Sequence, residues 1–313
     1  MIAERKQAGR GLVSPELAVL MAHCKIFLYA QLLESDLPED PYLSHDLERY
    51  FPAPLPERYR TEMREHRLRR EIIATVVANQ LVDRAGTTFA YRLGEETGGP
   101  AQALARAYAV AREVFGMREF WNEVEALDNE VAARTQLEML TQGRRLVERS
   151  ARWLVRRNPE GIEIANTVRH FAPGAEALWG ALPNILEEAD RASFDAREAE
   201  LLEAGVPAAF AVRVASMPSM FSALDIVDVA NETGRSLKAV TVAYFELGCR
   251  LQLNWLRDRI VELPRANRWQ ALARAALRDD LYSLHGASPA KRSRRRGPTA
   301  PARIRSTRRS TRG

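Results

Sequence analysis

The chain has 313 residues, 46% of them hydrophobic, with 17 glycines and 16 prolines, which excludes a fully disordered chain and leaves room for one large or two ordinary domains with a sizeable core. The net charge of +5 is unevenly distributed, because residues 286–313 hold ten of the 46 basic residues and no acid. Residues 1–285 therefore carry 36 basic and 41 acidic side chains, and the basic character belongs to the C-terminal tail.

The first predicted helix spans residues 14–34. Ser14 is expected at its N-cap, Pro15 at the first helical position and Glu16 near the positive end of the helix dipole. An apolar stripe at helical spacing follows: Leu17, Leu20, Met21, Cys24, Phe27 and Leu28.

A proline-rich connector follows this helix. Prolines interrupt it at five positions: Pro38, Pro41, Pro52, Pro54 and Pro56. Because proline lacks a backbone N–H, long helices are not expected here. Large apolar side chains are expected to pin this ordered but irregular segment to the core: Tyr42, Leu43, Leu47, Tyr50 and Phe51.

Residues 66–85 predict an amphipathic helix of about five turns. Its apolar face would carry Leu68, Ile72, Thr75, Val76, Asn79 and Val82. Gly86 is expected to end the helix as a left-handed C-cap, and Thr87 to Tyr91 to continue as a short extended segment. Asn79 could either fix the register between two helices or contact solvent.

Basic residues gather at the start of the same helix: His66, Arg67, Arg69 and Arg70. They could bind an anion or an acidic neighbour. A solvated helix face with local pairs, such as Glu65 with Arg69, is the simpler interpretation.

The rest of the chain also has the pattern of helices. Residues 118–157 contain no proline and one glycine, Gly143, which predicts a single long helix with a kink near that glycine. Pro173 is expected to separate two further helices, over residues 161–171 and 174–204, and Gly205 and Pro207 are expected to end the second one. The other predicted helices cover residues 101–115, 207–216, 218–231, 236–262 and 269–284.

The fold class predicted from these elements is all-α, a multi-helix array with proline-rich connectors over residues 1–285, which could divide near residue 172. Residues 286–313 contain one large aliphatic side chain, Ile304, and several prolines. Such a segment cannot bury enough apolar surface to offset its ordering entropy, so a disordered basic tail is predicted.

Cysteine usage and the N-terminus point to the cytoplasm. Cys24 and Cys249 lie far apart within apolar helical patterns, which favours two reduced core side chains over a disulfide. The N-terminus has no apolar core of signal-peptide length, and no stretch reaches the roughly 18 uncharged apolar residues of a membrane span. We therefore expect a cytoplasmic protein that does not cross a membrane.

The search for catalytic and binding residues gives a negative result. The close glycine pairs, Gly9 with Gly11 and Gly98 with Gly99, neither follow a predicted strand nor have a third glycine, as a dinucleotide site requires. The histidines lack the spacing of metal ligands: His23, His45, His66, His170 and His285. The serines considered as nucleophiles lack the flanking glycines of a nucleophile elbow: Ser14, Ser35 and Ser150.

Two further groups have a simpler structural interpretation. The paired acids are expected to be solvated or helix-terminal charges: Glu95, Glu96, Asp279 and Asp280. The tryptophans are expected in the core and at helix contacts: Trp121, Trp153, Trp179, Trp255 and Trp269. No catalytic, cofactor-binding or metal-binding residue is therefore assigned.

Several blocks in order along the chain resemble the C-terminal region of the large bacterial NAD-specific glutamate dehydrogenases. They are GRGLVSPELAVLMAHCKI at 9–26, ESDLPEDPYL at 34–43, RYFP at 49–52, HRLRREIIAT at 66–75 with LVDRAGTTF at 81–89, RLGEETG at 92–98, EALDN at 125–129, SALDIVDVANETGR at 222–235 and ALRDDLY at 276–282. The resemblance implies a piece of that enzyme family without its catalytic part. None of the four lysines, Lys6, Lys25, Lys238 and Lys291, has the glycine-rich context of the family's catalytic lysine.

The resemblance also implies a function. The complete enzymes oxidatively deaminate L-glutamate to 2-oxoglutarate and ammonia with NAD. This portion would bind no cofactor itself, would brace the catalytic region or build a homo-oligomer, and would be inactive alone. A truncated or split gene product is the expected origin, and the departure from the family pattern after about Leu284 suggests a shifted reading frame.

Two alternatives belong to other classes. A stand-alone helical scaffold or interaction protein is one. A non-specific nucleic-acid binder acting through residues 291–312 is the other, although no aromatic residues or folded recognition motif accompany those arginines.

If the chain is part of a larger enzyme, its contact face should be apolar and exposed. The residues expected there come from the first helix and the connector: Leu17, Leu20, Phe27, Tyr42, Leu43, Tyr50 and Phe51.

Overall fold

The computed structural model describes residues 2–186, 188–264 and 266–286. Within these ranges the chain forms seventeen α-helices, three short 3₁₀ helices and one π-helical turn, and no strand. The all-α prediction is confirmed. The predicted disordered tail lies outside the described residues, apart from Gly286.

The N-terminal third consists of one long helix and a series of short ones. The bounds are α1 Ile2–Gln7, α2 Ser14–Glu34, η1 Leu37–Glu39, η2 Pro41–Leu43, α3 Ser44–Tyr50, α4 Leu55–Arg58, α5 Arg60–Arg64, α6 Arg69–Gln80 and the π-helical turn η3 Leu81–Ala85. The proline-rich connector is thus built from short helical turns of three to seven residues.

Longer helices make up the rest. The bounds are α7 Phe89–Thr97, α8 Ala101–Val114, α9 Met117–Ala126, α10 Ala133–Arg157, α11 Ile164–Ala181, η4 Leu182–Asn184, α12 Glu188–Glu203, α13 Ala208–Met220, α14 Ala223–Thr233, α15 Leu237–Arg250, α16 Leu253–Glu262 and α17 Arg268–Gly286.

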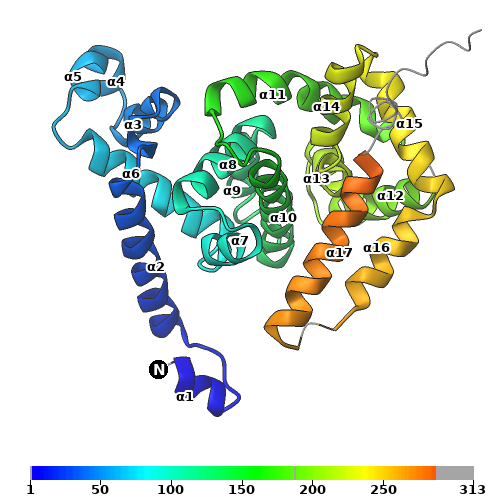
Figure 1. Ribbon diagram of the computed structural model, residues 1–313, viewed down its shortest axis with the longest axis horizontal. Helices are drawn as coiled ribbons and strands as arrows, with labels where there is room; N and C mark the ends of the chain where they lie inside the picture. The colour runs from blue at the N-terminus through cyan, green and yellow to red at the C-terminus, as the bar shows by residue number, and fades with distance from the viewer. Residues whose placement is uncertain (1, 187, 265, 287–313) are drawn as a thin grey trace, which may run out of the picture.

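α8 forms the centre of the core. Nine of its 14 residues are buried, and the buried run from Ala107 to Arg112 is continuous, so the helix is covered on all sides. α10 and α11 pack along it, and α2, α7 and α9 complete its surroundings. In Figure 1, α2 leads from this centre toward α1, and α12 to α17 lie on the opposite side of α10.

The helix expected at 66–85 is real, but its buried face differs from the prediction. Ile73 and Val77 are buried, whereas Leu68 is 54% exposed and Thr75 is also exposed. The doublets Ile72-Ile73 and Val76-Val77 offer two apolar faces to choose from, and packing against α2 and α3 selects the second. Asn79 is half-buried.

The ends of two predicted elements were wrong in detail. Val13, not Ser14, is the N-cap of α2. Gly86 has φ 99° and ψ 156°, a glycine conformation outside the left-handed helical region. The extended segment expected at Thr87 to Tyr91 is absent, because α7 begins at Phe89 and buries that ring.

The single helix predicted over 118–157 was wrong. α9 ends at Ala126, and the chain turns through Asn129, whose φ of 66° is a conformation that asparagine tolerates. Buried Leu127 and Val131 hold this turn against the core, so α9 and α10 pack side by side instead of continuing. α10 itself runs through Gly143 without a break.

Two prolines and one helix junction were also predicted wrongly. Pro173 lies inside α11 instead of separating two helices, because Phe171 and Ala175 on either side of it are buried and offset the lost hydrogen bond. Pro218 likewise lies inside α13. The helix predicted over 236–262 is divided by Gln252, which has a φ of 51°.

Candidate functional site

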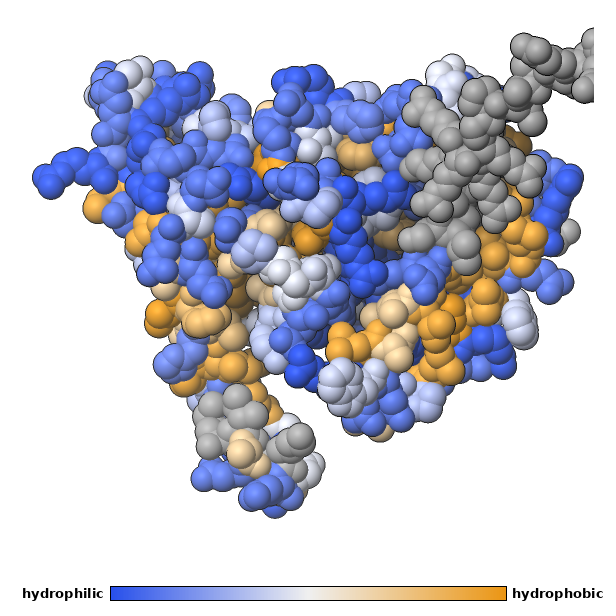
Figure 2. All heavy atoms as spheres, viewed as in Figure 1, coloured by the Kyte–Doolittle hydropathy of each residue, from blue (hydrophilic) through white to orange (hydrophobic). Residues whose placement is uncertain are grey.

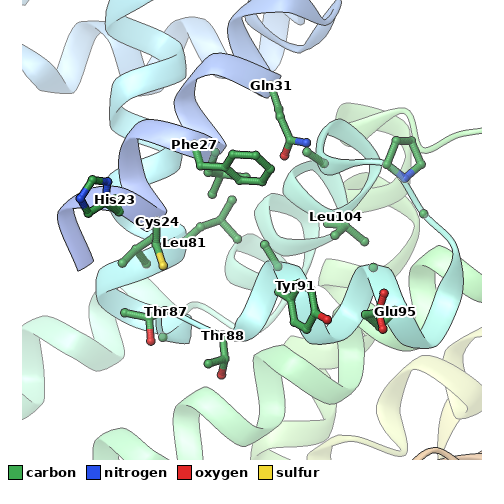
Figure 3. Close-up of a pocket in the computed structure, with 18 residues that line it drawn as sticks. His23, Cys24, Phe27, Gln31, Leu81, Thr87, Thr88, Tyr91, Glu95 and Leu104 are labelled. Atoms are coloured by element: carbon green, nitrogen blue, oxygen red, sulfur yellow. The ribbon is translucent and has the colours of Figure 1, made fainter. Parts of the chain in front are cut away.

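An apolar cleft lies between α2 and the region around α7 (Figure 3). α2 contributes His23, Cys24 and Phe27, and α7 contributes Tyr91 and Glu95. The cleft has a volume of about 590 Å³, and most of its wall is hydrocarbon. An enclosure of this size and character suits the side chains of another apolar surface.

The outer face of α2 continues this cleft. Only Leu28 and Leu32 are buried among its 21 residues. Ile26 is 65% exposed and Phe27 is 68% exposed, and hydrophobic residues gather along this helix at the lower left of Figure 2. We name the cleft and this exposed face together the α2 surface.

α2 is also the one helix among the described residues that is long and apolar enough to cross a membrane by length and composition. The mean hydropathy of its most apolar 18-residue stretch is 1.4. Lys25 lies in the middle of the helix and makes a 2.8 Å ion pair with Asp83 of η3. This contact holds α2 against the body of the protein.

The residues expected on the exposed apolar face divide into two groups. Leu17, Phe27 and Tyr50 are exposed, by 43%, 68% and 57%. Leu43 is only 1% exposed, which confirms its expected role as an anchor of the connector and shows that its assignment to the exposed face was wrong. Tyr50 was also expected to be an anchor, and its exposure shows that this part of the prediction was wrong. The remaining members are half-buried: Leu20, Tyr42 and Phe51.

A buried charge cluster joins the connector to the core. Asp46 of α3 and Arg112 of α8 are each 2% exposed and form a 3.0 Å ion pair. Asp46 also binds Arg118, and Glu113 accepts a 3.1 Å hydrogen bond from Arg118 Nε. Gln80 of α6 accepts another bond from Arg112.

The charges of this cluster are matched, because two carboxylates and two guanidinium groups pair with one another. Burial opposes the charge on Asp46, but Arg112 and Arg118 beside it hold the pKa of that carboxyl below its usual value. Asp46 and Arg112 are 66 residues apart, and no local spacing in the sequence links them.

The acids of the connector are paired as well. Arg106 contacts Asp36 at 3.2 Å and Asp40 at 3.4 Å. The Glu39 carboxylate forms ion pairs with Arg69 and with Arg70, each with an N–O distance of 2.5 Å. The expected local pair of Arg69 with Glu65 was therefore wrong. The basic start of α6 therefore binds an acidic neighbour from the connector, which was the alternative interpretation of those residues.

The paired acids at 95–96 and 279–280 connect helices. Glu95 pairs with Arg268 at the start of α17, and Glu96 accepts a 2.6 Å hydrogen bond from Arg152 of α10. Asp279 of α17 lies 2.5 Å from Arg156. The prediction of solvated or terminal charges was wrong for Glu96 and Asp279, because their partners lie on neighbouring helices.

The two close glycine pairs have structural positions. Gly9 and Gly11 lie between α1 and α2, and Gly98 is the left-handed C-cap of α7. A Cβ on Gly99 would meet Val155 at 3.0 Å, so close helix packing explains this glycine. Neither pair forms a turn between a strand and a helix.

The other residue classes considered in the sequence have structural positions. In the described part of the chain, no group of three or more His, Cys, Asp or Glu side chains could hold a metal ion. Trp121 is 6% exposed, but Trp255 and Trp269 are 60% and 75% exposed, so a core role for these two was wrong. Cys249 is exposed on α15, which also contradicts the expected core position.

Comparison with known proteins gives a consistent result. Residues 9–289 match the family model described as glutamate dehydrogenase, C-terminal. Three relatives named NAD-specific glutamate dehydrogenase align with 90% of this chain: those of Halomonas elongata at 40% identity, Pseudomonas aeruginosa at 41% and Mycobacterium tuberculosis at 38%. The chain spans only 17% of the length of each relative.

Proposed function

The chain belongs to the family of glutamate dehydrogenase C-terminal regions, and from this premise we propose that it is a helical brace for the catalytic region of an NAD-specific glutamate dehydrogenase. In this proposal the remainder of the enzyme binds NAD and oxidises glutamate. The chain itself supplies no catalytic group and is inactive alone. Assembly into a homo-oligomer remains a prediction from the family resemblance, and a cytoplasmic location remains a prediction from the cysteines and the N-terminus.

The observation that carries the proposal is the α2 surface. Covering one large aliphatic or aromatic side chain is worth about 1.5–3 kcal/mol, so a row of them along α2 favours a covering partner. Val19, Ile26 and Phe27 are at least 48% exposed along this helix. The relatives contain a long polypeptide beyond the matched segment, and that polypeptide is the partner we propose.

A protein partner fits α2 better than a lipid bilayer does. The Lys25–Asp83 ion pair lies halfway along the helix, so inserting α2 into a membrane would break it or bury both charges. The C-terminal part of α2 is also packed on α6 through Leu28 and Leu32. α2 is apolar around most of its circumference, which is typical of a helix covered on all sides, but the described chain covers it on one side only.

The test is co-expression of the 313-residue chain with a Pseudomonas aeruginosa relative that lacks the matching segment. We expect the two to co-purify and to reduce NAD in a glutamate-dependent manner, whereas the chain alone should not. Phe27→Asp should lower co-purification at least about tenfold, because a buried, unpaired carboxylate costs several kcal/mol. Leu137→Asp is the matched control, since Leu137 is 64% exposed on α10 and Phe27 is 68% exposed.

Failure of the wild-type chain to co-purify would contradict the proposal. Equal losses for Phe27→Asp and Leu137→Asp would show that the α2 surface is not the contact. If the chain alone, but not Phe27→Asp, floats with lipid vesicles in a density gradient, a membrane is the partner instead. Glutamate-dependent NAD reduction by the purified chain alone would overturn the inactive-brace proposal.

A further inference from the structure

A pocket rich in arginine lies between α10 and α17, on the side of α10 that is turned away from α2 (Figure 1). Four arginines of one α10 face and one arginine of α17 line it: Arg149, Arg152, Arg156, Arg157 and Arg278. Asp279 contributes the one carboxylate on its wall. The lining itself therefore carries five positive charges and one negative charge, and Asp279 contacts Arg156 at 2.5 Å and also interacts electrostatically with Arg152 and Arg278.

Carboxylates behind the wall hold two of these guanidinium groups in place. Arg152 donates to Glu96 at 2.6 Å and forms an ion pair with Glu148 at 3.6 Å, which likewise does not line the pocket. Arg157 donates to Asp225 at 3.3 Å and to Asp228 at 3.2 Å; with Glu96 these are the hydrogen-bonded acids behind the wall. These three acids do not line the pocket. The arginines are thus fixed by contacts on their outer sides, and their positive charge is oriented before any ligand arrives.

Arg149 differs from its neighbours. It is half-buried, and no ion pair or hydrogen bond joins its side chain to another described residue. Changing Arg149 therefore removes positive charge from the pocket without breaking a salt bridge. This makes it the informative residue for an experiment.

The apolar part of the wall strengthens the attraction for an anion. Phe221 is 5% exposed, and the Trp153 ring lies under the Arg157 guanidinium, 4.8 Å from its carbon. Low-dielectric walls concentrate the field of nearby charges. Burial also raises the pKa of Asp279, although Arg152, Arg156 and Arg278 oppose this.

We propose that this pocket binds a small oxyanion, either phosphate or a short dicarboxylate, which bridges α10 and α17. Guanidinium groups match both ligands through paired N–H donors. The pocket volume of about 160 Å³ corresponds to about five water volumes, which is enough for one such ion. The proposal does not depend on the bracing function, because α2 takes no part in it.

The experiment measures modification of each arginine by phenylglyoxal in the full chain, read by mass spectrometry. Inorganic phosphate, glutarate and chloride are compared at equal ionic strength. At ten times the dissociation constant, the bound anion should slow the reaction of Arg149 and Arg278 about tenfold, since only the free protein reacts. Arg144, an exposed residue of α10 that does not line the pocket, should react at an unchanged rate.

Two arginine variants test whether the anion binds in this pocket. The anion should also raise the melting temperature saturably in the wild type and in Arg144→Gln, but not in Arg149→Gln. Protection by phosphate alone, by glutarate alone or by both supports the proposal and identifies the ligand class. Equal effects on Arg144 and Arg149, or no saturable protection by either anion, would overturn it.

Discussion

α8 and α2 are both apolar helices, and the structure uses them in opposite ways. Nine of the 14 residues of α8 are buried, compared with two of the 21 residues of α2. α8 is enclosed by α10, α11 and their neighbours, whereas α2 packs on α6 along one side and leaves the other side open (Figure 1). Apolar composition thus predicts that a helix will be covered, but it does not reveal whether this chain provides the cover.

The sharpest test of this contrast compares the ion pairs that hold the two helices. Asp46→Ala should destabilise the fold by about 3–5 kcal/mol, because it leaves Arg112 buried without its partner. Asp83→Ala removes the partner of Lys25 on α2 and should cost less than about 1 kcal/mol, because the Asp83 side chain is 45% exposed. Urea unfolding followed by circular dichroism measures both.

The pH dependence of the same variants provides a control. Arg112 and Arg118 lower the pKa of Asp46 despite its burial, so the ionised carboxylate is favoured in the folded state. Its stabilisation is present above the unfolded pKa, near 4, and is lost as pH falls through the folded-state pKa. The wild type should therefore lose its advantage over Asp46→Ala below about pH 4, and a difference that grows in acid would contradict this account.

A second test removes the same side chain from each helix. Leu104→Ala in α8 should cost about 2–4 kcal/mol, because Leu104 is 3% exposed and its loss leaves a cavity. Leu17→Ala in α2 should change stability by less than about 0.5 kcal/mol, because Leu17 is 43% exposed. Thermal unfolding of the chain alone measures both changes. A large cost for Leu17→Ala would mean that α2 is already covered in solution, for instance by a second copy of the chain.

A third test uses two helical glycines, for which effects of opposite sign are expected. A Cβ on Gly143 of α10 would lie 2.6 Å from Phe120 Cε1 and 2.8 Å from Met117 Cε, so Gly143→Ala should destabilise by about 1–2 kcal/mol. Gly180 of α11 has nothing within 4 Å of its Cβ position, and Gly180→Ala should stabilise by about 0.5–1 kcal/mol. Differential scanning calorimetry of both variants measures whether the two changes in stability have opposite signs. A stabilised Gly143→Ala variant would show that the contact between α9 and α10 is loosely packed.

Local signals in the sequence were sufficient for the fold class and for many helix ends. Ser236 caps α15 by accepting a hydrogen bond from the Ala239 amide, and Gly205 follows α12 with a φ of 87°. These features depend on residues within one turn of each other, so a linear pattern reveals them. The exposure predicted for Leu17, Phe27 and Tyr50 was also correct, whereas Leu43 turned inward.

Contacts between distant segments decided the rest. The break at Asn129, the continuation of α11 through Pro173 and the pairing of Asp46 with Arg112 all depend on neighbours supplied by other helices. The arginine pocket likewise exists only because α17 returns to α10. The sequence alone determined that apolar helices form and where many of them stop, because hydrogen bonds and caps are local. Only the tertiary structure decided which faces are buried, because burial depends on how helices far apart in the chain pack together.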